Sequence, residues 1–203
     1  MSHLIDAIEA ETRGDFASAA EHYRHLTESG SPVDRIGIYQ ALARCREKLG
    51  ELKAAGEWRR RAGEAYLKLT DAEMPKDERL YLALVEYRNA VQALVGDDAL
   101  KGILGEYKQV LAENWKGGPE GLTHEGLFGG ILLLRVGDHA AAMRYLFDAS
   151  EAISEQATER GDLTLREAAR RGYELAHEAA TKAGNMQIAQ VAKVRAFDLG
   201  QPQ

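Results

Sequence analysis

One kind of dipeptide recurs five times along the chain. It is a glycine followed by Asp, Glu or Asn, and each copy lies between two stretches of helical periodicity. Glycine suits the left-handed turn that ends a helix, and the polar residue after it suits the start of the next helix. The pattern therefore predicts a series of helix pairs joined by very short turns. The five dipeptides, 36 to 47 residues apart, are Gly14-Asp15, Gly50-Glu51, Gly96-Asp97, Gly137-Asp138 and Gly184-Asn185.

The residues after each glycine form one helical face. Apolar or small residues stand two, five, nine and twelve positions after the glycine, which places them on one side of a helix. At the fifth position Ala19, Ala55 and Ala142 are small enough to let two helices cross closely, and we expect all three to be buried. The third copy departs from this pattern, because Lys101 occupies that position.

The periodicity and the turn residues predict an all-α chain of ten helices. The most irregular stretch, residues 116–121, is the predicted hinge. Thr164 with Glu167 has the pattern of a capping box. The predicted helices cover residues 3–13, 15–29, 33–49, 51–70, 77–94, 98–115, 122–136, 138–158, 164–183 and 185–198.

These features resemble the tetratricopeptide repeat (TPR) family, whose helix-turn-helix unit has small residues at the crossing and Gly-Asp at the turn. Tyr39, Leu42 and Ala43 fall where the family places an aromatic residue, a leucine and a small residue. Ala7 and Gly130 take the small position in two other copies, and Tyr173 takes an aromatic one. The resemblance is to a divergent, long-helix variant. It implies one domain over residues 1–203, a right-handed superhelix (α-solenoid) of about five antiparallel helix pairs.

The resemblance also implies a function, because TPR-like superhelices bind a peptide or helix of another protein on a concave face lined by the first helix of each pair. Of the groove residues, the three arginines are expected to share that face and to hold acidic residues of a partner segment whose apolar anchor meets Leu127 or Ile131. In the alternative interpretation the arginines lie on the outer surface. The implied groove residues are Gln40, Arg44, Glu47, Lys48, Leu127, Ile131, Leu134, Arg135, Arg171, Glu174, Glu178 and Lys182.

The segment 127–134 is apolar on every side, which is typical of a helix enclosed by its neighbours. Gly129 and Gly130 lower its helix propensity, so another backbone is expected to approach closely there. Two interpretations stay open: a central core helix, or a helix that lines an apolar ligand or peptide groove. A small-molecule or lipid-binding pocket around residues 127–134 is therefore the alternative function.

The sequence contains few patterns of residues that could support catalysis or metal binding. Glu174 and His177 form a Glu-x-x-His motif, of which di-iron bundles need two copies, so a metal-carboxylate enzyme is a second alternative. His22 and His25 have helical spacing, but the sequence around them offers no third ligand. Cys45 is interpreted as a packed structural thiol. We accordingly expect no catalytic residue, no metal and no cofactor.

Charge and composition limit the classes of partner that the chain is expected to bind. The formal net charge of −6 argues against a nucleic-acid binder. No apolar run reaches the roughly 18–20 residues that span a bilayer, and acidic residues near the start do not suit a secretory signal. The sequence therefore predicts a cytoplasmic, non-enzymatic scaffold or adaptor that binds another protein, with homo-oligomerisation left open, no nucleic acid and no membrane insertion.

Overall fold

The computed structural model describes residues 2–114 and 123–201, which contain ten α-helices and no strand, as an all-α fold requires. The helices are α1 (Ser2–Thr12), α2 (Phe16–Arg24), α3 (Pro32–Lys48), α4 (Leu52–Lys68), α5 (Lys76–Ala93), α6 (Leu100–Asn114), α7 (Thr123–Arg135), α8 (His139–Arg160), α9 (Leu163–Lys182) and α10 (Met186–Gly200). None of these described helices combines the length and the apolarity needed to cross a membrane.

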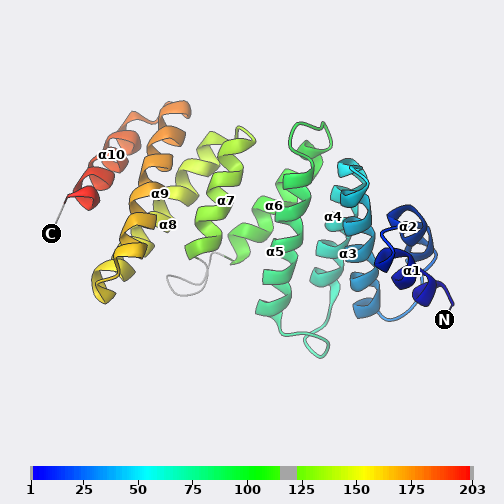
Figure 1. The fold of residues 1–203 in the computed structure, drawn as a ribbon. Helices are drawn as coiled ribbons and strands as arrows, with labels where there is room; N and C mark the ends of the chain where they lie inside the picture. Colours follow the sequence, from blue (N-terminus) through cyan, green and yellow to red (C-terminus); the bar gives the residue numbers. More distant parts are fainter. Residues whose placement is uncertain (1, 115–122, 202–203) are drawn as a thin grey trace. The chain divides into compact units, whose positions relative to one another are not determined.

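The chain divides into two compact units, one holding α1 to α6 and the other α7 to α10. Within each unit every helix packs against the next one in the chain, and the paired helices run in opposite directions (Figure 1). The predicted hinge at 116–121 lies outside the described residues. A single domain over residues 1–203 stays a prediction.

The predicted glycine turns are confirmed. All five glycines have φ between 75° and 89°, the left-handed region that other residues rarely adopt. At the first turn, the amide of Gly14 donates to the carbonyl of Glu11, and the amide of Asp15 to that of Ala10. This is the Schellman pair of bonds, and it recurs at Gly50, Gly137 and Gly184. The third copy differs, because the Asp97 amide donates to the carbonyl of Leu94, only three residues earlier.

Whether the polar residue after the turn glycine caps the next helix depends on the length of its side chain. Asp15, Asp138 and Asn185 each accept a hydrogen bond from a backbone amide of the following helix, as N-caps do. Glu51 makes no capping bond, and its longer side chain pairs with Arg46 at 2.6 Å. The predicted capping box at Thr164 is wrong, because Asp162 is the N-cap of α9 and accepts from the Thr164 and Leu165 amides.

The largest error in the predicted helices concerns α2, which ends at Arg24 rather than at residue 29. The Leu26 amide donates to the Tyr23 carbonyl, and the Thr27 hydroxyl donates to the Arg24 carbonyl at 2.9 Å. A short polar side chain that bonds the backbone in this way competes with the helical ladder. The local tightening therefore closes the helix early.

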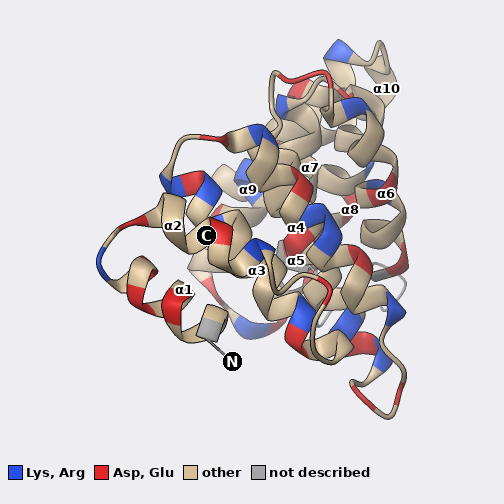
Figure 2. Ribbon diagram, turned by 90° about the vertical axis from the view of Figure 1, so that its right-hand side faces the viewer, with Lys and Arg blue, Asp and Glu red and all other residues tan. Residues whose placement is uncertain are grey.

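Small residues form much of the core. Ala19, Ala55 and Ala142 have no exposed surface, as predicted. Cys45 is likewise fully buried, in a cluster with Ala7, Tyr23 and other residues of the first three helices. Basic and acidic residues are interspersed along the helices (Figure 2).

Candidate functional site

The implied groove residues fall in both units, so each unit is described by itself. The first unit holds Gln40, Arg44, Glu47 and Lys48, all on α3. The second holds the other eight, on α7 and α9.

On α3, Gln40 and Glu47 bind neighbouring helices of their own unit. The amide of Gln40 donates to Glu86 of α5 at 2.7 Å, and Arg59 of α4 bridges Glu47 and Glu86 at 3.1 and 3.2 Å. Glu86 is only 4% exposed, and a buried carboxylate without partners is costly, so these contacts stabilise it in the core. This network joins α3, α4 and α5, and both Gln40 and Glu47 take part in it.

Arg44 and Lys48 are the exposed members of the α3 set. The Arg44 guanidinium lies 3.4 Å from the carboxylate of Glu11 on α1, and half of the Arg44 side chain is open to solvent. Lys48 stands in the last turn of the helix, where a positive charge suits the dipole. The first unit thus presents Arg44 and Lys48 at its surface, while Gln40 and Glu47 are bonded to neighbouring helices.

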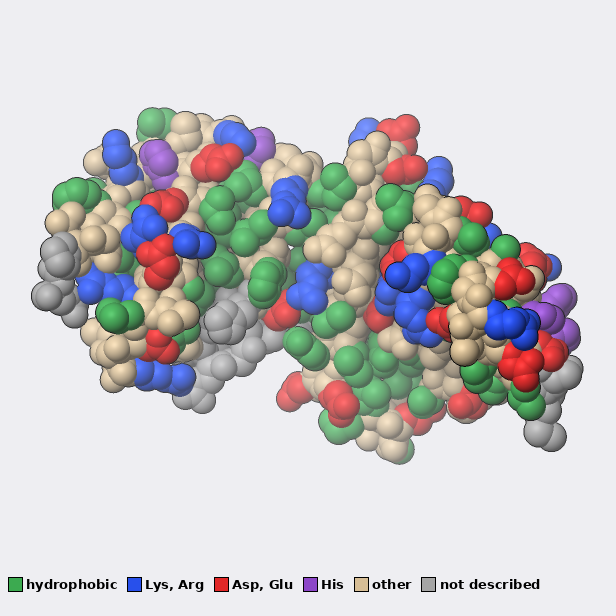
Figure 3. All heavy atoms as spheres, viewed as in Figure 1, with side chains coloured by type: hydrophobic (Ala, Val, Ile, Leu, Met, Phe, Trp, Pro, Cys, Tyr) green, Lys and Arg blue, Asp and Glu red, His purple; other side chains and the backbone are tan. Residues whose placement is uncertain are grey.

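In the second unit the space between α7 and α9 forms a groove of about 660 Å³. We call it the α7–α9 groove. It brings together three of the implied residues, the two apolar anchors Leu127 and Ile131 of α7 and Arg171 of α9. Hydrophobic side chains gather over α7 in Figure 3. The remaining lining residues, all on α9, are Leu163, Thr164, Glu167, Ala168, Gly172 and Leu175.

The groove exists because α7 uses its other faces for packing. Leu132 and Leu133 are buried, and a Cβ added at Gly130 would lie 2.6 Å from the side chain of Leu146 on α8. The close approach expected from the glycines is therefore present at Gly130. Leu127 and Ile131 are only partly buried and face α9 across the groove. The two interpretations of 127–134 are compatible, since the helix is packed on one side and lines a groove on the other.

The depth of the groove depends on a second glycine. A Cβ at Gly172 would lie 2.9 Å from the Leu127 side chain and would clash with the Ser150 hydroxyl. That hydroxyl is fully buried and donates to the Leu146 carbonyl at 2.6 Å. Gly172 therefore allows α9 to lie against α7 and α8 with Leu127 between them.

Charge is confined to one edge of the groove. The carboxylate of Glu167 accepts hydrogen bonds from Arg170 at 2.7 Å and from Arg171 at 2.8 Å. These two guanidinium groups lower the pKa of Glu167 to about 2, so the carboxylate is charged at neutral pH. The Arg171 side chain is 71% exposed. Solvent screens such a pair, so Arg171 can exchange its partner at little cost.

Five implied residues do not line this groove. Arg135 is exposed at the end of α7, and Lys182 pairs with Glu178 one turn away at 2.6 Å on α9. Glu174 pairs with Arg170, and Leu134 is partly buried. Sequence reasoning missed the six other lining residues of α9, although Thr164, Ala168, Gly172 and Leu175 follow one another at intervals of three or four residues, which is the signal of one helix face.

The Glu-x-x-His motif lies within α9, where it contacts α10. His177 donates from Nδ1 to the carbonyl of Ala189 at 2.9 Å, and the Glu174 carboxylate is held by Arg170. Within the described residues these two side chains do not belong to a group of three or more potential metal ligands. His177 is thus bonded across the helix contact, and Glu174 is paired within its own helix.

Comparison with known proteins gives a fold but not a family. No protein-family model matches the sequence, and no curated protein matches it. Among solved structures, BtubC (BKLC) from P. vanneervenii is similar, with a TM-score of 0.57 and 18% sequence identity. The match covers 97% of this chain and 80% of that one. At this identity the likeness concerns the fold alone.

Proposed function

We propose that this chain is a non-enzymatic scaffold or adaptor built as a TPR-like, right-handed α-solenoid, and that a segment of another protein binds in its α7–α9 groove. The recurring Schellman turns with buried alanines after them support the repeat assignment. The similarity to BtubC over most of both chains supports only the all-α fold on which the proposal is built. Stacked helix pairs provide extended binding surfaces without catalytic loops.

The observation that carries the proposal is the composition of the groove. Its floor is apolar, with Leu127 and Ile131 facing Leu175, and an exposed guanidinium stands at one edge. A partner side chain that fills the floor removes apolar area from water, which is worth about 25 cal/mol per Å². The anchor of the partner is therefore a leucine-sized or aromatic side chain.

The charged edge of the groove favours a partner segment with an acidic residue next to its apolar anchor. When a partner carboxylate takes Arg171, Glu167 keeps its bonds to Arg170 and is not left unpaired. Arginine also binds a carboxylate through two parallel N–H bonds, which adds geometric specificity. The expected partner is thus a short segment with one apolar anchor beside Asp or Glu.

The test uses short peptides selected from a random display library against the full chain and then labelled with a fluorophore. Enriched peptides are expected to carry an apolar residue next to Asp or Glu. An Arg171→Glu variant should bind them at least about tenfold more weakly, which corresponds to 1.4 kcal/mol, because it sets like charges against each other.

Arg135→Glu is the matched control, since Arg135 is exposed on the same unit but does not line the groove. It should bind the peptides within about twofold of the unaltered chain, because screened surface charges contribute little. Equal weakening by both variants, at unchanged melting temperature, would show that binding follows net charge and not the groove. Failure to enrich any peptide would contradict the proposal.

The alternative of a small-molecule site concerns the same groove, whose volume lies within the roughly 300–1,000 Å³ of ligand pockets. Native mass spectrometry of the freshly purified chain separates the two functions. A copurified organic mass that is lost on Ile131→Glu would replace the scaffold proposal with ligand binding.

A further inference from the structure

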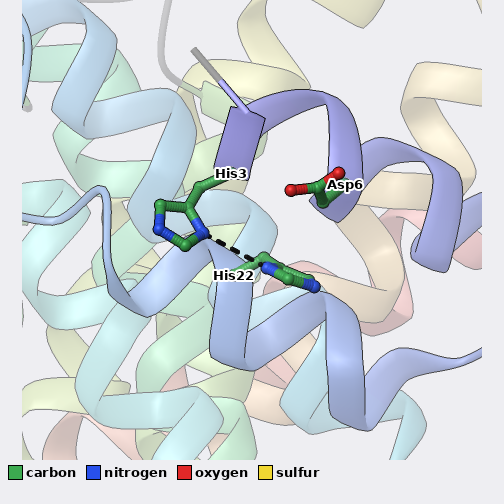
Figure 4. A group of neighbouring side chains, drawn as sticks. All are labelled: His3, Asp6 and His22. Atoms are coloured by element: carbon green, nitrogen blue, oxygen red, sulfur yellow. Dashed lines mark hydrogen bonds between the residues drawn. The ribbon is translucent and has the colours of Figure 1, made fainter.

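Three side chains with metal-ligating atoms meet where α1 packs against α2. His3 and Asp6 stand three residues apart on α1, hence on one face of that helix. His22 comes from the facing side of α2 (Figure 4). The three ligand atoms lie within 4.8 Å of one another. Among the described residues, no other group of three or more His, Cys, Asp or Glu side chains is close enough to hold one ion.

The spacing of the two imidazoles fits a common coordination geometry. Nδ1 of His3 lies 3.4 Å from Nδ1 of His22. Zinc binds imidazole nitrogen at about 2.0–2.1 Å, and its ligands stand at the corners of a tetrahedron. Two nitrogen ligands of one zinc ion are therefore about 3.3–3.4 Å apart. The pair is thus already separated by one edge of a zinc tetrahedron, while the Asp6 carboxylate needs only a small side-chain movement to complete a third vertex.

We propose that His3, Asp6 and His22 bind one divalent transition-metal ion of the zinc class. Two imidazoles and one carboxylate suit zinc, cobalt, nickel or copper better than magnesium or calcium, which prefer oxygen ligands. His3 is exposed and the other two side chains are partly buried, which leaves an entry path for the ion. The fourth position faces solvent and takes water or a donor side chain of a partner.

The sequence drew attention to a different histidine pair, His22 and His25, for which it offered no third ligand. His22 lies in α2 and His25 is the residue that caps its C-terminal end, but the ring of His25 stacks on that of His3 at a centroid distance of 4.9 Å and is not part of the group of ligand atoms. The missing ligands come from α1, nineteen positions earlier in the case of His3. Such a site ties α1 to α2, and it lies in a different unit from the α7–α9 groove.

The test uses the full chain without a histidine tag, stripped with EDTA and titrated with Co²⁺. One equivalent should bind, with the visible absorption bands of low-symmetry four-coordinate cobalt, and Zn²⁺ should displace it. Because bound metal stabilises only the folded state, the melting temperature should rise with added Zn²⁺. Affinity should fall in acid, since the ligands must lose their protons.

Variants decide which residues hold the ion. His3→Ala and His22→Ala should each weaken Co²⁺ binding by more than about tenfold. Loss of a residue that only supports a metal ligand already weakens binding by about tenfold or more, and loss of the ligand itself should have a larger effect. His25→Phe is the matched control, because it keeps a ring stacked on His3 but carries no ligand atom, and it should bind within about threefold. Far-ultraviolet circular dichroism checks that each variant is folded.

Two results would overturn the assignment. One is binding of less than half an equivalent of both Co²⁺ and Zn²⁺ by the folded, unaltered chain. The other is an equal loss of affinity in His25→Phe and His22→Ala, which would indicate unspecific binding to surface histidines.

Discussion

Cys45 lies in α3 with no exposed surface, although its neighbours in the sequence are Arg44 and Arg46. Cationic neighbours lower a thiol pKa when they share its environment. Here burial has the larger effect and raises the pKa of Cys45 from 9.0 to about 11. The guanidinium of Arg44 pairs with Glu11, and that of Arg46 with Glu51. The structure thus agrees with the prediction of a packed thiol.

The thiol of Cys45 should be inert in the folded chain. We expect no reaction with a thiol-specific disulfide reagent at pH 8 and complete reaction in guanidinium chloride, since the reagent needs an accessible thiolate. Because the pKa is higher in the folded state, burial of the protonated thiol contributes stability below pH 9, and this contribution is lost as the pH rises towards 11. Rapid reaction without denaturant would contradict the packing of α3.

At the scale of helices, local signals in the sequence predicted most of the helix ends. The Gly-acid turns act within one or two residues of where they stand, so the helix ends follow from the chain itself. The early end of α2 was missed because it depends on one competing bond, from the Thr27 hydroxyl to the Arg24 carbonyl. Capping by Asp162 rather than Thr164 was missed for a similar reason.

The candidate sites were less predictable, because their residues come from helices that meet only after folding. Leu127 and Arg171 share a groove because Gly172 lets α9 approach α7, which no local pattern expresses. His3 reaches His22 in the same way, through the packing of α1 on α2. The expected use of Gln40 as a groove residue overlooked its partner Glu86, which lies 46 residues away.

Helix crossing is testable at Ala142, which is fully buried five residues after the turn glycine. Ala142→Leu should overpack α8 and lower the free energy of unfolding by roughly 1–3 kcal/mol. Urea denaturation measures the change. Ala140→Leu is the control, because Ala140 is exposed on the same helix and a surface substitution changes stability by less than about 0.5 kcal/mol. An unchanged urea midpoint for Ala142→Leu would remove the repeat alignment of this copy.

For the molecule as a whole, the pattern of contacts is one-dimensional within each unit. In the first unit the contacts run from α1 to α2, from α2 to α3 and so on to α6. Side chains reach somewhat further, as when Arg60 of α4 pairs with Glu106 of α6 at 2.8 Å. In such arrays stability is approximately a sum of single-repeat and nearest-neighbour terms. Damage to one helix pair is therefore expected to spread only to its neighbours.

Ala19→Leu tests this expectation, because Ala19 is fully buried in the short helix α2 and a leucine there overpacks its contacts with α1 and α3. Hydrogen exchange followed by mass spectrometry should show amides of α1, α2 and the start of α3 exchanging at least about tenfold faster, since local openings have their own free energies. Amides of α5 and α6 should keep their protection. Ala17→Leu, at an exposed position of the same helix, should leave all of these rates unchanged. Uniform acceleration from α1 to α6 would instead mean that the unit unfolds as one cooperative block, and the nearest-neighbour description would fail.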